Sequence, residues 1–232
     1  VYLDDVIVHA KTLADEFENL RTVFQRLRQA GLKLISRKCH LFQKSVRYLG
    51  HVVSESGIAV DPEKTMAVGS WPEPRNKTEV RSFLGLSTYY RRFIPHFADV
   101  ARPLQQLTEK NREFSWTEEC QGSFENLKQL LTLTPILAYP NLTGEFCLDT
   151  DASDYAIGAV LSQKQNDKER VVAYFSRTLT RSERNYCVTR KELLAVVKSI
   201  EHFNYYLYGQ KFRVRTDHSA LQWLMSFREP QG

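Results

Sequence analysis

The second half of the chain carries three strand-like runs, a long helical run and one more strand, and this order constrains the fold more than any other feature. The runs are apolar and β-branched where strands are expected, and the helical run repeats at helical spacing. An order of this kind predicts an α/β sheet domain. The expected elements are strands at 145–151, 156–163 and 170–176, a long helix started by Thr180 and Glu183, a strand at 211–216, and a short helix from Ser219.

The first sixty residues follow a different order. Thr12 and Asp15 form an N-capping pattern, and apolar residues recur at helical spacing from Leu13 to Leu27 before Gly31. The sequence therefore predicts a helix here. The strands expected around it are two short ones within residues 1–10, one at 32–35 and one at 46–53 that is closed by a turn near residues 55–57.

The middle of the chain is predicted to be helical. Residues 71–74, Trp-Pro-Glu-Pro, form a stiff break, and Asn76 with Glu79 begins the next helix. Pro95 and Pro103 are expected to divide the following stretch into short helical pieces. A further helix is expected to begin at Thr117.

Composition excludes few function classes. A hydrophobic content of 42% and a charged content of 25% are ordinary for a globular protein, and the net charge of +5 only mildly favours a polyanionic partner. No apolar run reaches the roughly 20 residues that span a bilayer, and no secretion signal begins the chain, so we expect no membrane partner and an intracellular location. The four cysteines form no CxxC pattern and are expected to be reduced thiols.

Two adjacent acids, Asp4 and Asp5, stand inside the apolar run VYLDDVIVHA. Aspartate is a common turn residue, so a simple hairpin turn is one interpretation. The apolar flanks and the absence of Gly or Asn favour another, because two like charges in such a place repel each other unless a cation lies between them. Carboxylate oxygens are the ligands that Mg²⁺ prefers, and the pair is therefore a candidate metal site.

Three more acids in the second half lie where they could also bind metal. Asp151 and Asp217 each follow a Thr at the end of an expected strand, and Glu192 borders the apolar stripe of the helix between them. Because the carboxyl ends of parallel strands face one crevice, the three could hold a pair of metal ions of the kind used in phosphodiester chemistry. The alternative is three unrelated surface acids.

The segment from Tyr89 to Arg92 also has two interpretations. Its rings could stack on bases and its arginines could bind phosphate, or it could form a helix with core rings and a solvated basic face.

In their order along the chain, these motifs resemble the pol polyprotein of gypsy-type LTR retrotransposons. YLDDVIV resembles the reverse-transcriptase active-site hairpin, YLGHVVSESGI its primer-gripping strand pair, and the segment from DPEKTMAVGSW to ADVARPL its thumb. FSWTEECQGSFENLKQLLTLTPILAYP resembles the tether that follows. TDASDYAIGAVLSQ, YFSRTLTRSERNYCVTRKELLAVVKSI and FRVRTDHSALQWL resemble the RNase H domain.

The resemblance implies a fold and domain boundaries. It implies an α/β (α+β) fold with part of a reverse-transcriptase palm, a helical thumb and an RNase H-like mixed-sheet domain. The implied boundaries are 1–60 for the palm part, 61–107 for the thumb, 108–143 for the tether and 144–232 for the RNase H-like domain. The third polymerase acid and the fourth RNase H acid of the family would lie outside this sequence, so we expect a fragment that is inactive as a polymerase and poor or inactive as a nuclease.

The resemblance also implies residue roles and partners. Asp4 and Asp5 would hold Mg²⁺, or Mn²⁺, for polymerisation, and Asp151, Glu192 and Asp217 would hold it for cleavage of RNA in RNA–DNA hybrids. The implied partners of the full-length parent are RNA template, DNA primer, hybrid and dNTP, in a cytoplasmic virus-like particle or in the nucleus. A domesticated or degenerate nucleic-acid-binding protein without catalysis is the alternative. The implied substrate-binding residues are Tyr2, Leu49, Gly50, His51, Tyr89, Arg91 and Arg92.

Overall fold

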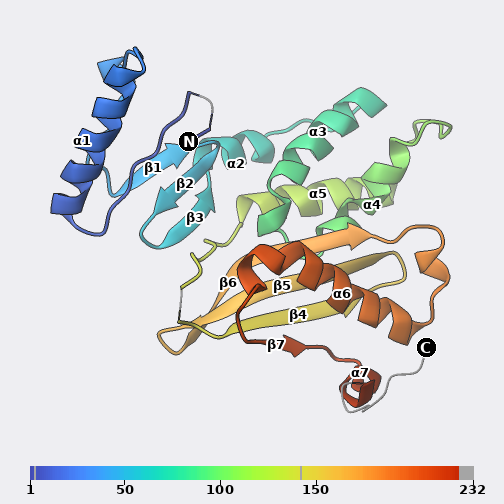
Figure 1. The fold of residues 1–232 in the computed structure, drawn as a ribbon. Helices are drawn as coiled ribbons and strands as arrows, with labels where there is room; N and C mark the ends of the chain where they lie inside the picture. Colours follow the sequence, from blue (N-terminus) through green and yellow to red (C-terminus); the bar gives the residue numbers. More distant parts are fainter. Residues whose placement is uncertain (3, 142, 225–232) are drawn as a thin grey trace. The chain divides into compact units, whose positions relative to one another are not determined.

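The computed structural model describes residues 1–2, 4–141 and 143–224, which fall into two compact units, Val1–Glu55 and Ser56–Gly232. Both contain helices and strands, which confirms the predicted mixed α/β class (Figure 1). Each unit is described by itself below. Within the described residues, no helix combines the length and the apolar character needed to cross a membrane.

The first unit consists of one long helix and a small hairpin. Helix α1 spans Leu13–Gln29, and the Thr12 side chain accepts a hydrogen bond from the Asp15 backbone N–H, as the capping pattern predicted. The 3₁₀ turn η1 (Ser36–Lys38) follows, and strands β1 (Ser45–Tyr48) and β2 (His51–Ser54) then pair antiparallel.

The prediction of a single strand at 46–53 was wrong, because the chain reverses at Leu49-Gly50. Both residues have positive φ angles, 49° and 71°, and Tyr48 pairs directly with His51 across the turn. A two-residue loop with both central φ angles positive matches the right-handed twist of the flanking strands, and glycine adopts this conformation without strain. The apolar run is therefore a hairpin.

The strands predicted within residues 1–10 and at 32–35 were also wrong. Tyr2 and Asp5 form an isolated bridge, with backbone N–H to carbonyl distances of 2.9 Å in both directions. Residues 6–10 and 32–35 are in neither helix nor strand, and Leu32 is 60% exposed. Strand propensity is expressed only where a partner strand is present, and the described residues offer none to these segments.

The second unit begins with strand β3 (Gly57–Val60) and a helical layer. Its helices are α2 (Pro62–Gly69), α3 (Lys77–Tyr89), α4 (Phe97–Leu107) and α5 (Glu118–Thr132), with the 3₁₀ turn η2 (Arg91–Phe93) before α4. Asn76 caps α3 and Thr117 caps α5, as predicted. The layer encloses one apolar core, in which the rings of Phe83 and Phe124 lie 4.6 Å apart.

Pro103 does not divide the helical stretch as predicted, because α4 continues through it. A proline within a helix cannot donate an N–H and disturbs the carbonyls of the preceding turn. The Ser123 hydroxyl of α5 donates a 2.6 Å hydrogen bond to the carbonyl of Val100 in that turn. The neighbouring helix thus adds a hydrogen bond to the turn that precedes the proline.

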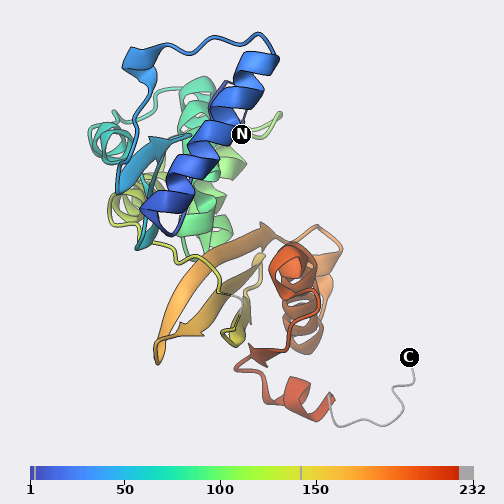
Figure 2. The same ribbon diagram turned by 60° about the vertical axis from the view of Figure 1, so that its left-hand side comes forward.

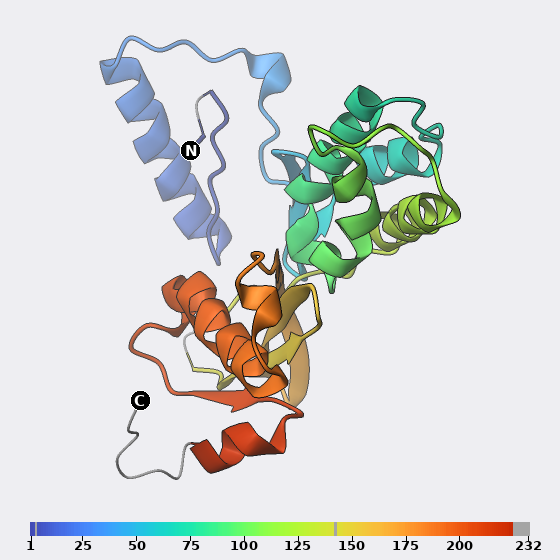
Figure 3. The same cartoon turned by 90° about the vertical axis from the view of Figure 1, so that its right-hand side faces the viewer.

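The sheet that follows has the strand order β6-β5-β4-β7. Strands β4 (Phe146–Ala152), β5 (Ala156–Gln165) and β6 (Lys168–Thr178) are antiparallel neighbours, and β7 (Phe212–Arg215) joins β4 in parallel. Helix α6 (Val188–Leu207) packs on one face (Figure 2). Strand β7 lies at the sheet edge, and α7 (Ser219–Leu224) comes after it (Figure 3). The predicted strand-and-helix order is confirmed.

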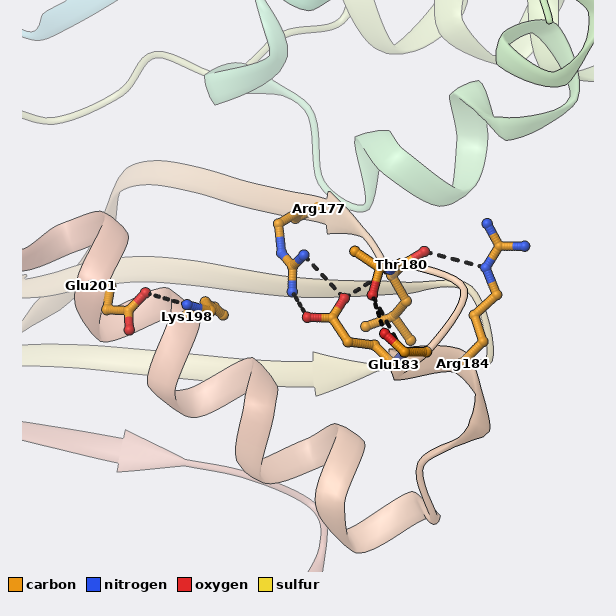
Figure 4. Close-up of polar contacts among 8 residues, drawn as sticks. Arg177, Thr180, Glu183, Arg184, Lys198 and Glu201 are labelled. Carbon is orange, nitrogen blue, oxygen red and sulfur yellow. Dashed lines mark hydrogen bonds and ion pairs between the residues drawn. The ribbon is translucent and has the colours of Figure 1, made fainter.

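One boundary in this domain was wrong: the long helix begins at Val188 and not near Thr180. Thr180 and Glu183 do form the reciprocal capping contacts, but these close only the 3₁₀ turn η3 (Glu183–Asn185). Arg177 of β6 binds the same Glu183 carboxylate through two nitrogens, at 3.1 and 3.0 Å (Figure 4). The capping pair therefore anchors the connection to the sheet and does not start α6.

Strand β6 joins the helical layer to the sheet. Val172 belongs to the core under α6, while Tyr174 packs against the helical core. Because both cores share this strand, residues 56–232 form one unit, and the structure divides the chain at residues 55 and 56. The functional boundaries at 60, 107 and 143 stay predictions.

Candidate metal centre

Three carboxylates meet at one end of the sheet. Asp151 is in β4, Asp217 lies two residues after β7, and Glu192 lies in the first turns of α6. Because β4 and β7 are parallel, their carboxyl ends lie at the same edge. One oxygen from each carboxylate lies within 4.8 Å of the others. The structure thus brings together the three acids that the sequence predicted as a set.

Glu192 is the buried member of the trio, with 4% exposure, whereas Asp151 and Asp217 are exposed. Burial raises the pKa of Glu192 above its ordinary value, and the negative charges of Asp151 and Asp217 raise it further. The backbone N–H of Ala152 donates a hydrogen bond to this carboxylate and partly opposes the shift. The site therefore concentrates negative charge at a place where one acid is poorly solvated.

The donor set fits a hard divalent cation. Glu192 Oε2 is buried and has no hydrogen-bond partner, although buried carboxylate oxygens are ordinarily paired. Three carboxylates with an unpaired buried oxygen match the oxygen ligands that Mg²⁺ and Mn²⁺ take. A cation between them would offset their mutual repulsion.

Polar contacts beside each acid hold its element in place. Lys191, next to Glu192, donates a 2.8 Å hydrogen bond to Asp154 on the β4–β5 turn and lowers the pKa of that aspartate. His218, next to Asp217, lies 2.8 Å from the Thr189 hydroxyl on α6. The three acid-bearing segments are thus tied to one another within a residue or a few residues of each ligand.

A second acidic cluster on β4 has a different character. Asp149 shares the strand face of Asp151, but Arg215 donates to both of its oxygens. Arg215 also binds Glu169, and these contacts raise the pKa of the guanidinium and lower that of Glu169. Cys147 lies nearby. Because an arginine already neutralises both acids, this cluster is an ion-pair network, and Asp151 is the better metal ligand.

The first unit presents the other predicted pair. Asp4 and Asp5 are both exposed at the Tyr2–Asp5 turn, and the Tyr48 hydroxyl reaches the Asp5 carbonyl at 3.4 Å. Among the residues that the structure describes, no third His, Cys or acid joins this pair within ligand distance. Tyr2 is 58% exposed beside it.

The predicted primer-contact residues Leu49, Gly50 and His51 lie at the β1–β2 turn. Leu49 and Gly50 form the reversal itself, and His51 opens β2. The three residues therefore lie together at the tip of the β1–β2 hairpin.

The predicted phosphate-contact residues of the second unit are largely engaged within it. Tyr89 is 53% exposed, whereas its neighbour Tyr90 is buried in the helical core. Arg91 donates to the carbonyl of Ser176 in β6, and burial lowers its pKa. The guanidinium of Arg92 lies 5.8 Å from the ring of Phe93. The alternative of core rings beside a basic face describes much of this segment.

Sequence reasoning missed the residues that support the trio. These are Asp99, Ser153, Asp154, Thr189, Lys191 and His218. Their pairing depends on which elements pack together. The only signal in the sequence was regular spacing: Asp151 and Ser153 are two residues apart, and His96 and Asp99 are three residues apart.

Two protein-family descriptions match parts of the chain. Residues 116–214 match the family described as the RNase H-like domain found in reverse transcriptase. Residues 1–53 match the family described as reverse transcriptase (RNA-dependent DNA polymerase).

Curated relatives cover almost the whole chain. The retrovirus-related Pol polyprotein from transposon 297 of Drosophila melanogaster is 41% identical over 231 residues, 99% of this chain and 21% of the relative. The transposon Tf2-3 polyprotein of Schizosaccharomyces pombe is 37% identical over 223 residues, 95% of this chain and 17% of the relative. The chain therefore spans about a fifth of the length of these polyproteins.

Solved structures show the same fold. The foamy viral protease-reverse transcriptase dRH, in complex with double-stranded DNA, has a TM-score of 0.83 at 24% identity and covers 99% of this chain and 41% of that one. The foamy viral protease-reverse transcriptase in complex with an RNA/DNA hybrid has a TM-score of 0.81 at 23% identity, covering 98% of this chain and 31% of that one.

Proposed function

Because the chain belongs to the Pol polyproteins of gypsy-type LTR retrotransposons and carries their reverse-transcriptase and RNase H-like segments, we propose that its second unit supplies acids with which the full-length parent cleaves RNA in RNA–DNA hybrids. The carboxylate trio of Asp151, Glu192 and Asp217 carries this proposal. Three clustered acids with an unpaired buried oxygen are suited to metal-assisted phosphodiester hydrolysis.

Each acid has a distinct part in this proposal. Divalent cations, Mg²⁺ or Mn²⁺, would supply the positive charge that activates water and stabilises the phosphate in the transition state. Asp151 and Asp217 are exposed, so their oxygens would hold the cations where a nucleic-acid backbone has access. Glu192 would be the buried ligand, held in place by the hydrogen bond from the Ala152 N–H.

For the full-length parent, we propose RNA-directed DNA synthesis, with Asp4 and Asp5 as polymerase metal ligands. The partners would be RNA template, DNA primer, RNA–DNA hybrid and dNTP, in a cytoplasmic virus-like particle or in the nucleus. The foamy viral structures in complex with double-stranded DNA and RNA/DNA hybrid support a nucleic-acid partner. Tyr2, Leu49, Gly50, His51, Tyr89, Arg91 and Arg92 would contact these substrates.

We propose that the 232-residue chain by itself extends no primer and cleaves hybrid poorly or not at all. Two-metal chemistry needs a full ligand set, and Asp4 and Asp5 stand without a third acid among the described residues. A primer-extension assay of the purified chain with Mg²⁺ tests this, and robust extension would overturn it.

Metal binding tests the nuclease proposal directly. Isothermal titration with Mn²⁺ should detect a site whose affinity falls at least tenfold in Asp151→Asn. Asp149→Asn separates the two acids that share the strand face, and it should leave the Mn²⁺ affinity within twofold. Asp167→Asn, at an exposed turn between β5 and β6, is the matched control.

Hybrid cleavage separates the enzyme from the non-catalytic alternative. If the parent polyprotein binds hybrid but shows no Mn²⁺-dependent cleavage, the alternative of a non-catalytic nucleic-acid-binding protein is favoured. Mn²⁺ binding that is unaffected by Asp151→Asn would reject the trio as the site.

A further inference from the structure

Helix α4 contacts the β4–β5 turn through three side chains that share one helix face. His96, which caps α4, Asp99 and Arg102 are spaced by three residues, and they meet Asp151, Ser153 and Tyr155, which are spaced by two. The pairs are His96 Nδ1 to Asp151 Oδ2 at 3.9 Å, Ser153 Oγ to Asp99 Oδ1 at 2.7 Å, and the Arg102 guanidinium to the Tyr155 ring centroid at 3.3 Å. We call these three pairs the α4 latch.

The central pair organises the turn. The Ser153 hydroxyl donates to Asp99 and accepts the backbone N–H groups of Tyr155 and Ala156 at 3.2 and 2.9 Å. A hydroxyl has one proton and two lone pairs, and the two N–H groups occupy both lone pairs. The hydroxyl also lies 3.2 Å from the Ala156 carbonyl oxygen, a longer contact for the proton than the 2.7 Å one to Asp99. The charged acceptor Asp99 directs the proton, which leaves the lone pairs for the turn. Asp99 thereby acts on backbone that begins two residues after Asp151.

The helix that makes these contacts is itself firmly held. Phe97, Ala101 and Leu104 are buried in the helical core. The backbone N–H of Ala98 donates a 2.9 Å hydrogen bond to the Ser176 hydroxyl of β6. A helix anchored on its opposite face is a rigid support for the turn.

His96 completes the contact at the carboxylate itself. Its backbone is left-handed, with a φ of 50°, and its side chain lies above the Asp151–Gly158 strand pair. A cavity of about 130 Å³ lies there, lined by His96, Asp151, Gly158 and Tyr174 among others. The latch thus reaches the edge of the metal centre from the face of the sheet opposite to α6.

We propose that the α4 latch positions Asp151 for metal binding, with Asp99 as its main positioning residue. The inference rests on the proposed nuclease function and extends it to a helix outside both family matches, which cover residues 1–53 and 116–214. A ligand whose backbone is held by a neighbouring element loses less freedom when a metal binds. The helical layer therefore contributes to the nuclease site.

Mn²⁺ affinity of the 232-residue chain, measured by isothermal titration, tests the latch. Asp99→Ala and Ser153→Ala should each weaken binding about tenfold, and the double variant should be no weaker than either single one. Asp99→Asn keeps the acceptor oxygen without the charge and should bind within threefold of the wild type. Glu113→Ala, which removes an exposed acid before α5, is the matched control and should bind as the wild type does.

Arg102→Ala is the second variant, because it leaves the hydrogen bonds of Ser153 in place. It should weaken Mn²⁺ binding about threefold while the circular dichroism spectrum stays that of the wild type. Asp151-dependent Mn²⁺ binding that is unchanged in Asp99→Ala and Arg102→Ala would overturn the latch and leave the nuclease proposal intact. Absence of any Asp151-dependent binding in the wild type would instead reject the nuclease proposal, and the latch with it.

Discussion

Glu192 sits at 4% exposure beside two other carboxylates, and its burial and their charges raise its pKa. A carboxyl whose pKa is raised by folding contributes stability that is fully present below its unfolded pKa, about 4.5, and lost as pH rises through the folded pKa. Without metal, Glu192→Gln should therefore be more stable than the wild type at pH 7, by about 1 kcal/mol. At pH 4 the two proteins should be nearly equal in stability.

Urea unfolding in EDTA at the two pH values measures this difference. Repeating it with Mn²⁺ should reverse the order at pH 7, because the cation stabilises the wild type and binds the variant weakly. A Glu192→Gln variant that is less stable than the wild type in EDTA at pH 7 would contradict the inference that the ionised Glu192 destabilises the folded protein.

Glu183 has the opposite environment. The two hydrogen bonds from Arg177 lower the pKa of Glu183 to about 2, with help from Thr180 (Figure 4). A lowered pKa gives stability that is present above the unfolded value of about 4.5 and lost as pH falls toward 2. Glu183→Gln should destabilise the protein by about 1 kcal/mol at pH 7, a figure reduced for solvent screening at a partly open pair.

The difference between Glu183→Gln and the wild type should shrink as pH falls from 4.5 toward 2, which urea unfolding can follow. Glu201→Gln is the matched control in the same view, because Glu201 pairs with Lys198 only at an exposed position on α6 (Figure 4). It should change stability by no more than about 0.5 kcal/mol. A pH-independent loss in Glu183→Gln would show that the carboxylate charge is not what matters.

Among the helices, α6 begins without a side-chain cap. Cys187 occupies the N-cap position before Val188, with an extended backbone and no side-chain capping bond. A serine hydroxyl at the N-cap accepts a hydrogen bond from a backbone N–H of the first turn, whereas the Cys187 thiol accepts none. Cys187→Ser should therefore raise stability by about 0.5–1 kcal/mol.

Thermal unfolding measures the effect, with Cys187→Ala as the control that adds no cap and should be near neutral. Equal stability of the Ser and Ala variants would place the true helix start elsewhere.

At the scale of the whole molecule, the two units differ in how much apolar surface they bury. Among the described residues of Val1–Glu55, Leu20 is the one buried hydrophobic side chain, whereas the second unit holds the extended cores around Phe83 and Phe203. Local stability follows buried apolar contact. Backbone amides of α1 should therefore exchange with solvent at least a hundredfold faster than those of α5.

Hydrogen exchange followed by mass spectrometry checks this on the intact chain. Peptides from residues 13–29 and 118–132 are the pair to compare, since both are single uninterrupted helices. Equal protection of the two helices would mean that the chain unfolds as one cooperative unit.

The strand and helix order of the second half could be predicted from the sequence pattern, and the resemblance to a known family singled out the carboxylate trio. Periodicity and caps are local, so the caps of α1, α3 and α5 could be read from Thr12, Asn76 and Thr117. Asp151 and Asp217 were predictable as neighbours because the handedness of strand–helix–strand connections fixes which strand ends meet.

Other features depend on contacts between residues that are distant in the sequence, and these could not be predicted from it. Residues 32–35 have strand propensity but no neighbouring strand among the described residues, and α4 continues through Pro103 while packed against α5. Thr180 and Glu183 cap a short turn because Arg177 holds the carboxylate on the sheet. The α4 latch likewise joins residues more than fifty positions apart. Local sequence sets the propensity of a segment, but pairing and packing with distant residues decide whether that propensity is expressed.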